Sequence, residues 1–211
     1  MNPNPLVHVV DDDASMLSAL LLLLKESGYQ ARGYGSTGEI LLEPLPDRPG
    51  CLLLDVHLPG PSGLDLQSAL QRRGPTLPIV FLSGHADVES AVRAMKAGAV
   101  DFLTKPVKRE VLLEAVQRAL ALDARQRTIG DEARRLQAHF TSLTQRQRGV
   151  FQSIVAGKLN KQIAYDLGLG ERTVKREREQ VMMKLEARSA ADLGRLAEMM
   201  QCAARKQQMV P

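Results

Sequence analysis

The sequence has few cysteines, few aromatic residues and no long apolar run. It contains two cysteines and no tryptophan, and aromatic residues make up 3% of its 211 positions. Cys51 and Cys202 are far apart, which argues against a disulfide framework or a zinc site and for a reducing compartment. The densest apolar run, residues 16–24, is too short to cross a bilayer, and no signal peptide is evident. We therefore expect a cytoplasmic protein with no membrane partner and with cores of Leu, Val, Ile and Ala.

Charge is unevenly distributed along the chain. Residues 1–122 hold 11 Lys and Arg against 14 Asp and Glu, a net charge of −3. Residues 123–140 hold 4 against 3, and residues 141–211 hold 13 against 7, a net charge of +6. An acidic first part and a basic last part predict two domains, the second of which meets a polyanion.

The first 122 residues alternate between strand-like and helix-like segments. Short β-branched or apolar runs predict strands, and longer amphipathic segments that close at glycines predict helices. The predicted strands are 6–10, 30–34, 51–55, 78–84 and 101–106, and the predicted helices are 14–28, 36–44, 63–74, 87–98 and 108–122. Five strands that alternate with five helices indicate a doubly wound, flavodoxin-like α/β domain with a parallel sheet covered on both faces.

Charged and hydroxyl side chains follow the predicted strands where each strand ends. The first strand ends at residues 11–13, three aspartates, the third at Asp55, the fourth at Ser83 and the fifth near Lys105. Ligands of open α/β sheets bind at this edge. Clustered carboxylates raise one another's pKa unless a cation compensates them, and hard oxygen ligands suit Mg²⁺. A carboxylate there can also act as a nucleophile toward a phosphoryl group, with Mg²⁺ and a lysine balancing the charge.

Four motifs in residues 5–122, together with their spacing, resemble the receiver domain of bacterial two-component response regulators. They are VHVVDDD, LLLDVHLPGPSG, VFLSGH and AMKAGAVDFLTKP. The resemblance implies that Asp11 and Asp12 hold Mg²⁺ together with Asp55 and the backbone carbonyl of His57. It further implies that a sensor histidine kinase phosphorylates Asp55.

The same resemblance implies a phosphate-binding and switch set. It comprises Ser83, Lys105 and the aromatic Phe102, and a cis Lys105–Pro106 bond is expected with it. Two simpler interpretations stand beside it: Asp13 is expected to cap the following helix rather than to bind metal, and the ring of His57 is not expected to be a ligand.

Residues 123–140 form a charged, helix-compatible connector. Its apolar stripe is patchy, so a dimeric coiled coil and a solvated linker helix both remain open. The helix-like segments of residues 141–211 follow without any strand pattern. Thr144 and Gln147 predict a capping box, Asn160 predicts a second cap, and a turn at 168–170 precedes a helix over 171–185. Two short helices around such a turn predict a helix-turn-helix.

The segment LTQRQRGVF…VAGKLNKQIAYDLGLGERTVKRERE resembles the LuxR-type four-helix DNA-binding domain of NarL/FixJ regulators, closest to FixJ/StyR-like members. We expect DNA contacts from residues of helix 171–185 and one lysine before it: Lys161, Arg172, Thr173, Lys175, Arg176, Arg178, Glu179 and Lys184. The sequence departs from the family at Gly170, Glu177 and Glu179. The two acids are expected to face phosphates unfavourably unless one reads a cytosine.

These interpretations combine into a DNA-binding response regulator that is not an enzyme. The expected domains are the receiver (1–122), the helical linker (123–140) and the LuxR-type helix-turn-helix domain (141–211). Expected partners are the sensor kinase, double-stranded promoter DNA, RNA polymerase and a second copy of the chain, which a stripe of Val88, Val92 and Met95 would meet after phosphorylation. The alternatives are an aspartate-nucleophile phosphatase, disfavoured by His57 where such enzymes carry a second Asp, and a regulator that binds DNA without phosphorylation.

Overall fold

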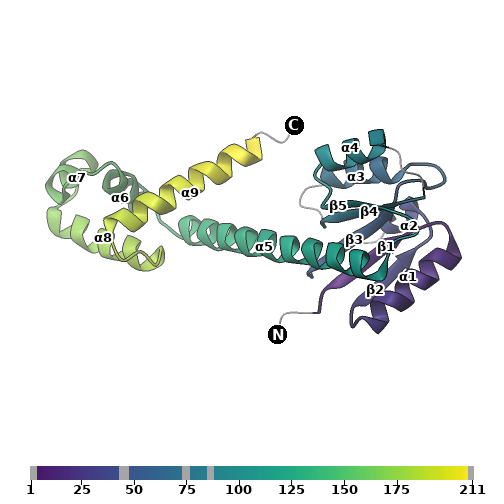
Figure 1. The fold of residues 1–211 in the computed structure, drawn as a ribbon. Helices are drawn as coiled ribbons and strands as arrows, with labels where there is room; N and C mark the ends of the chain where they lie inside the picture. The colour runs from purple at the N-terminus through teal and green to yellow at the C-terminus, as the bar shows by residue number, and fades with distance from the viewer. Residues whose placement is uncertain (1–3, 43–47, 73–76, 85–87, 209–211) are drawn as a thin grey trace. The chain divides into compact units, whose positions relative to one another are not determined.

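The computed structural model describes residues 4–42, 48–72, 77–84 and 88–208 (Figure 1). The chain forms two compact units, Met1–Arg127 and Thr128–Pro211. Helix α5 (Arg109–Thr141) begins in the first unit and ends in the second, and it includes the whole predicted linker. In the described part of the chain, no helix is both long and apolar enough to cross a membrane.

The first unit is built on a five-stranded sheet of order β2-β1-β3-β4-β5, and every neighbouring pair is parallel. The strands are β1 (Leu6–Val10), β2 (Gln30–Tyr34), β3 (Gly50–Asp55), β4 (Ile79–Ser83) and β5 (Asp101–Thr104). Every residue of β3 and β4 is buried, which explains why their sequences are nearly continuous apolar runs. The strand order reverses between β1 and β3, and ligands of such sheets bind beside this point.

Helices cover both faces of the sheet (Figure 1). On one face, α1 (Ala14–Glu26) and the first part of α5 pack on a core that includes Val7, Leu24 and Leu112. On the other face lie α2 (Thr37–Leu42), α3 (Gly63–Arg72) and α4 (Val88–Lys96), around Leu54 and Phe81. The predicted fold class is therefore confirmed, including the parallel sheet with two covered faces.

The buried carboxylate of Asp123 bonds α5 to the sheet at the start of β3. Asp123 is 4% exposed, and its Oδ2 accepts hydrogen bonds from the backbone N–H of Gly50 at 2.9 Å and from Arg127 Nε at 2.8 Å. Arg127 also donates to the carbonyl oxygen of Arg48 at 2.6 Å. Because Gly50 begins β3, this contact ties the helix to the strand that ends at Asp55.

The second unit contains the end of α5 and the helices α6 (Gln145–Val155), α7 (Asn160–Leu167), α8 (Glu171–Lys184) and α9 (Ala190–Gln208). Val150, Ile163, Val174 and Leu193 are fully buried in its core. This arrangement confirms the predicted all-helical domain, with α7 and α8 as the helix-turn-helix pair joined at Gly168, whose φ of 60° is left-handed.

The predicted helix caps are correct except at one position. Asp13 caps α1 by accepting from the backbone N–H groups of Ser15 and Met16, and Thr144 and Gln147 form the predicted capping box of α6. The cap predicted at Asn160 is wrong, because Leu159 occupies the N-cap position of α7 and its N–H donates to Gln162 Oε1 at 2.8 Å. Asn160 Oδ1 instead accepts from Arg178 at 3.2 Å, a tertiary contact that local spacing does not reveal.

Candidate functional site

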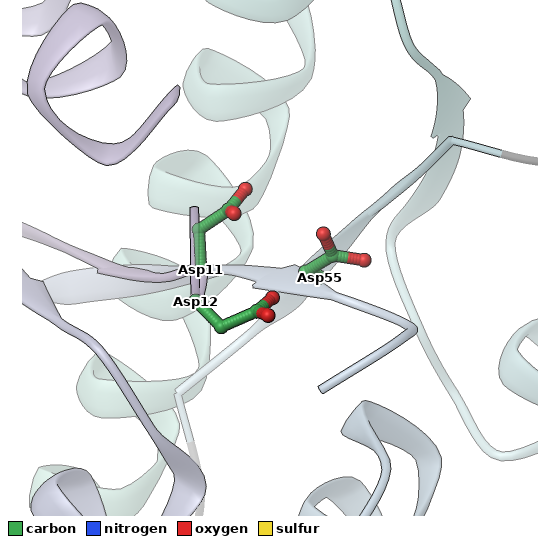
Figure 2. A group of neighbouring side chains, drawn as sticks. All are labelled: Asp11, Asp12 and Asp55. Atoms are coloured by element: carbon green, nitrogen blue, oxygen red, sulfur yellow. The ribbon is translucent and has the colours of Figure 1, made fainter. Parts of the chain in front are cut away.

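Three carboxylates lie together at the carboxyl ends of β1 and β3. Asp55 is the last residue of β3, and Asp11 and Asp12 directly follow β1. One oxygen of each lies within 4.8 Å of the others, and Figure 2 shows the three side chains next to one another. Asp11 is 1% exposed and Asp55 is 7% exposed, whereas Asp12 is exposed. The adjacent strands thus bring together the acidic residues that the sequence predicted as a site.

Backbone and lysine donors fix the two buried carboxylates. The N–H of His57 donates to Asp55 Oδ1 at 2.9 Å, and the N–H of Asp13 donates to Asp11 Oδ1 at 3.0 Å. Lys105 Nζ lies 2.5 Å from Asp55 Oδ2 and 2.6 Å from Asp11 Oδ2. Burial works to lower the pKa of Lys105, but its hydrogen bonds to Asp11 and Asp55 outweigh that effect and raise it above the ordinary 10.5. The lysine is therefore held as a cation against both carboxylates.

A tight loop after β3 passes directly over Asp55. The N–H of Gly63 donates to the carbonyl oxygen of Val56 at 3.0 Å. A Cβ atom at Gly63 would lie 2.2 Å from the carbonyl oxygen of Asp55, so a larger residue would displace the backbone here. This close approach explains the glycine that the sequence places eight positions after Asp55.

The residues present fit a hard divalent cation. The donors are carboxylate oxygens from three side chains, one of them exposed, so water has access to the cluster. Mg²⁺ typically takes one or two protein carboxylates and keeps several waters. Lys105 compensates part of the negative charge and so lowers the affinity of the cluster for a cation.

The remaining predicted receiver residues lie at the ends of β4 and β5. Ser83, the last residue of β4, is fully buried, and its backbone carbonyl accepts from the N–H of Lys105 at 2.7 Å. Phe102 is partly buried against the core below α4, with its ring centroid 6.2 Å from that of Phe81. The Lys105–Pro106 bond is cis, as the resemblance predicted.

An exposed apolar patch lies on α4. Val88, Val92 and Met95 are 76%, 45% and 46% exposed, while Ala94 on the opposite side of the helix is fully buried. The three residues proposed as a dimer stripe therefore face solvent rather than the sheet.

The side chains of α8 divide into an outward group and an inward group. Arg172, Lys175, Arg176, Glu179 and Met183 are exposed at helical spacing, and Lys161 is exposed on α7. Thr173 and Arg178 are half-buried. Lys184 is also half-buried, and its Nζ donates to the carbonyl oxygen of Ser142 and to Gln147 Oε1, both at 2.9 Å. Two of the hydrogen bonds of the Lys184 ammonium are therefore made within the domain.

The expectation that Glu177 faces the DNA phosphates is wrong. Its side chain is 15% exposed, and its Oε2 accepts from Gln147 Nε2 at 3.1 Å. Glu177 lies on the inner side of α8, with Val174 and Val181, which are fully buried. Only Glu179 of the two unusual acids points outward.

Both parts of the chain match known families. Residues 7–117 match the family described as "response regulator receiver domain", and residues 141–197 match "bacterial regulatory proteins, luxR family". The chain belongs to the DNA-binding two-component response regulators. The receiver domain of such a regulator implies a sensor kinase as its partner, and the LuxR-type domain implies DNA binding. Proteins of this family are transcriptional regulators.

The similarity to individual response regulators extends over nearly the whole chain. The chain is 44% identical to nodulation protein W of Bradyrhizobium diazoefficiens, over 92% of this chain and 85% of that protein. It is 40% identical to the transcriptional regulatory protein FixJ of Azorhizobium caulinodans, over 90% of each. A low-resolution structure of the response regulator StyR has a TM-score of 0.85 at 42% identity, over 92% of this chain and 98% of that chain. Full-length FixJ from B. japonicum has a TM-score of 0.57 at 33% identity, over 96% and 99%.

Sequence patterns did not identify the tertiary contacts of two residues, Asp123 and Gln147. Asp123 bonds α5 to β3, and Gln147 bonds α6 to α8. Asp123 stands in a charged stretch of α5 whose spacing does not distinguish it from solvated neighbours. Gln147 was predicted only as part of a capping box, although its side chain also reaches α8. The polar row Glu177, Gln180 and Lys184, spaced i, i+3 and i+7 on one helix, was the available signal for that second contact.

Proposed function

We propose that this response regulator is switched by phosphorylation of Asp55 by a sensor histidine kinase. The observation that supports it most is the position of Asp55, which ends a buried strand next to Asp11 and Asp12 and is held by Lys105. Mg²⁺ is proposed to bind Asp11, Asp12, Asp55 and the backbone carbonyl of His57. When bound, it supplies positive charge to the phosphoryl oxygens.

In the proposed step a carboxylate oxygen of Asp55 forms a bond to phosphorus while the bond from phosphorus to the donor breaks. The leaving group of the donor takes up the proton that it needs. The N–H of His57 fixes the orientation of the Asp55 carboxylate through Oδ1. Lys105, already against Oδ2, is placed to move from the carboxylates to the new phosphoryl oxygens.

The proposed response involves Ser83, Phe102 and the patch on α4. The buried hydroxyl of Ser83 at the end of β4 would bond to the phosphoryl group, and Phe102 would turn further into the space beneath α4. The change would favour dimers through Val88, Val92 and Met95. In this proposal residues 1–122 form the phosphoacceptor domain, 123–140 the linker and 141–211 the DNA-binding domain.

We further propose that α8 reads promoter DNA, through which the regulator would act on RNA polymerase. Lys175 and Arg176 lie on its outward face and are proposed to reach base edges. The phosphates of the DNA backbone are proposed to contact the residues that surround this pair: Lys161, Arg172, Thr173, Arg178 and Lys184. The Lys184 ammonium also bonds within the domain. Glu179 lies among these residues on the outward face.

Labelling with a small phosphodonor tests the phosphoacceptor. Acetyl phosphate and Mg²⁺ should label the wild type, whereas Asp55→Asn should remain unlabelled, and removal of Mg²⁺ with EDTA should abolish labelling. Asp131→Asn, which removes an exposed carboxylate from α5, is the matched control and should label fully. Labelling of the Asp55→Asn variant would show that another residue accepts the phosphoryl group. Footprinting of wild-type protein with and without acetyl phosphate then tests whether the modification changes DNA binding.

A further inference from the structure

The side-chain amide of Gln147 makes four hydrogen bonds inside the second unit. Its Oε1 accepts from the N–H of Thr144 at 3.1 Å and from Lys184 Nζ at 2.9 Å. Its Nε2 donates to Glu177 Oε2 at 3.1 Å and to Gln180 Oε1 at 2.7 Å. Gln147 is 3% exposed. An amide has two donor hydrogens and two acceptor lone pairs, so this buried group is fully satisfied.

The arrangement requires an amide in this orientation. If the amide were turned over, its N–H donors would face an ammonium and a backbone N–H, and its oxygen would face the Glu177 carboxylate. A glutamate at position 147 would retain the two acceptor contacts but would place a second carboxylate against Glu177. Because a buried polar group left without a partner is destabilising, the network strongly favours one arrangement.

Three of the four contacts join the start of α6 to one side of α8. Glu177, Gln180 and Lys184 are three and four residues apart and therefore share a side of that helix. The opposite side carries Lys175 and Glu179, which are exposed. Each residue adds about 100° of rotation around a helix axis, so fixing the inner side also fixes which side chains face outward.

We propose that Gln147 is a positioning residue for DNA recognition: it sets the rotation of α8 about its axis by bonding Glu177, Gln180 and Lys184. The inference rests on the proposed function, in which α8 reads DNA. It also explains the unusual acid at position 177, whose carboxylate is an acceptor for the amide rather than a group exposed to phosphate. Recognition sites depend on such support, because a small displacement of the reading side chains loses base contacts.

A charge-exchange experiment on the full-length protein tests the proposal. The probes are a duplex that the wild type selects from a random pool and a scrambled duplex of equal composition. Binding is measured with Mg²⁺ and beryllofluoride present, and the readout is the ratio of the two dissociation constants. The variants are Gln147→Glu, Glu177→Gln, their combination, and Gln145→Glu as the control. Gln145 is exposed two residues away on α6, so its substitution makes the same change in charge without touching the network.

Gln147→Glu should lower the ratio of the scrambled-duplex dissociation constant to the selected-duplex dissociation constant by about tenfold, the size of one lost base contact. Gln145→Glu should weaken both duplexes together and leave the ratio unchanged. The combination exchanges the amide and the carboxylate, restores one donor between positions 147 and 177, and should recover most of the ratio. An unchanged ratio in Gln147→Glu, or a combination as poor as the single variant, would overturn the proposal.

Circular dichroism and thermal melting separate positioning from folding. If Gln147→Glu fails to fold, the comparison of Glu177→Gln with the combined variant decides, because both leave position 177 neutral. In Glu177→Gln the new amide can turn its oxygen toward Gln147 Nε2, which leaves the Gln147 orientation unchanged, so the ratio should stay near that of the wild type. A loss in Glu177→Gln with no recovery in the combination counts against the proposal. If the wild type selects no common sequence from the pool, the proposed function fails instead.

Discussion

Lys105 Nζ lies 2.5 Å from Asp55 Oδ2 and 2.6 Å from Asp11 Oδ2, so one ammonium joins two buried carboxylates across the ends of β3 and β1. A bound cation would compete with this lysine for the same oxygens. The strength of that competition sets how readily the site takes up Mg²⁺, and it can be measured by removing the lysine.

Lys105→Met should lower the free energy of unfolding in EDTA by about 1–3 kcal/mol, because two buried acceptors lose a charged donor. Mg²⁺ should then stabilise the variant more than the wild type, since the cation no longer displaces an ammonium. Thermal melts across a Mg²⁺ titration measure both effects. Lys108→Met, an exposed lysine three residues later, is the control and should behave as wild type. Equal stabilisation by Mg²⁺ in both variants would show that Lys105 does not compete for the site.

Val92→Asp tests the α4 patch as a dimer surface. Its side chain is 45% exposed, so a carboxylate is tolerated by the monomer but would be buried in a dimer. Beryllofluoride should raise the dimer fraction of the wild type, with a coupling of about 1–3 kcal/mol, and should leave the variant monomeric. Sedimentation velocity gives the two fractions. Leu22→Asp on α1, where Leu22 is 58% exposed, should dimerise as wild type. If the wild type is equally monomeric with and without beryllofluoride, the dimer proposal fails.

Asp123→Ala tests the anchor of α5. The change removes the buried carboxylate that accepts hydrogen bonds from the N–H of Gly50 and from the Arg127 side chain. We expect a loss of about 1–3 kcal/mol in the free energy of unfolding by urea. Asp131→Ala removes a 68% exposed carboxylate further along the same helix and should cost much less. Similar losses in the two variants would mean that Asp123 contributes no more than a surface charge.

The thiol of Cys51 should be inert in the folded protein. Burial, and to a lesser extent the charge of Asp123, raise its pKa from 9.0 to about 12. In a Cys202→Ser background, a thiol reagent at pH 8 should therefore react with Cys51 only in denaturant. Rapid labelling without denaturant would show that the start of β3 becomes accessible to solvent in the folded protein.

The same shift makes stability fall at alkaline pH. Because the folded pKa is the higher one, the contribution of the Cys51 thiol is complete below pH 9.0 and is lost as pH rises toward 12. The stability of the wild type relative to Cys51→Ala should therefore fall above pH 9.0, at most by about 1.4 kcal/mol per pH unit. A difference that stays constant between pH 8 and 10.5 would contradict the raised pKa.

Local patterns were sufficient for the parallel sheet and for the acidic cluster. The apolar strands and the polar residues that end them depend on spacing within a few positions, and parallel strands bring such ends to one edge. Caps at Asp13 and Thr144 were also predictable, because a cap bonds within three residues of itself.

Tertiary partners were not predictable in the same way. The sequence around Asn160 is typical of a helix cap, and the sequence around Glu177 is typical of a solvated acid. Their actual partners, Arg178 and Gln147, lie 18 and 30 residues away. Asp123 bonds a backbone group 73 residues earlier, which leaves no trace in the side-chain pattern. Such polar contacts depend on which helix sides meet, and a single sequence does not specify this.

Glu179 gives the sharpest test of how α8 meets DNA. It is exposed on the same side as Lys175, four residues earlier, so it would lie beside the DNA backbone if that face enters the groove. A carboxylate there repels phosphates, and we expect Glu179→Gln to raise affinity for both the selected and the scrambled duplex and to leave their ratio unchanged. The plot of log affinity against log salt should become steeper by up to about one unit, because one opposing charge is gone.

The other outcome is that Glu179 accepts a hydrogen bond from a cytosine amino group. Glu179→Gln would then weaken only the selected duplex, by about 1–3 kcal/mol, and relax the preference at one base pair. Binding curves for both duplexes at two salt concentrations distinguish the cases, because a phosphate effect is shared between duplexes and depends on salt. Glu198→Gln on α9 removes an exposed carboxylate with the same change in net charge. If it raised affinity as much as Glu179→Gln, the effect would belong to the overall charge of the domain rather than to the face of α8.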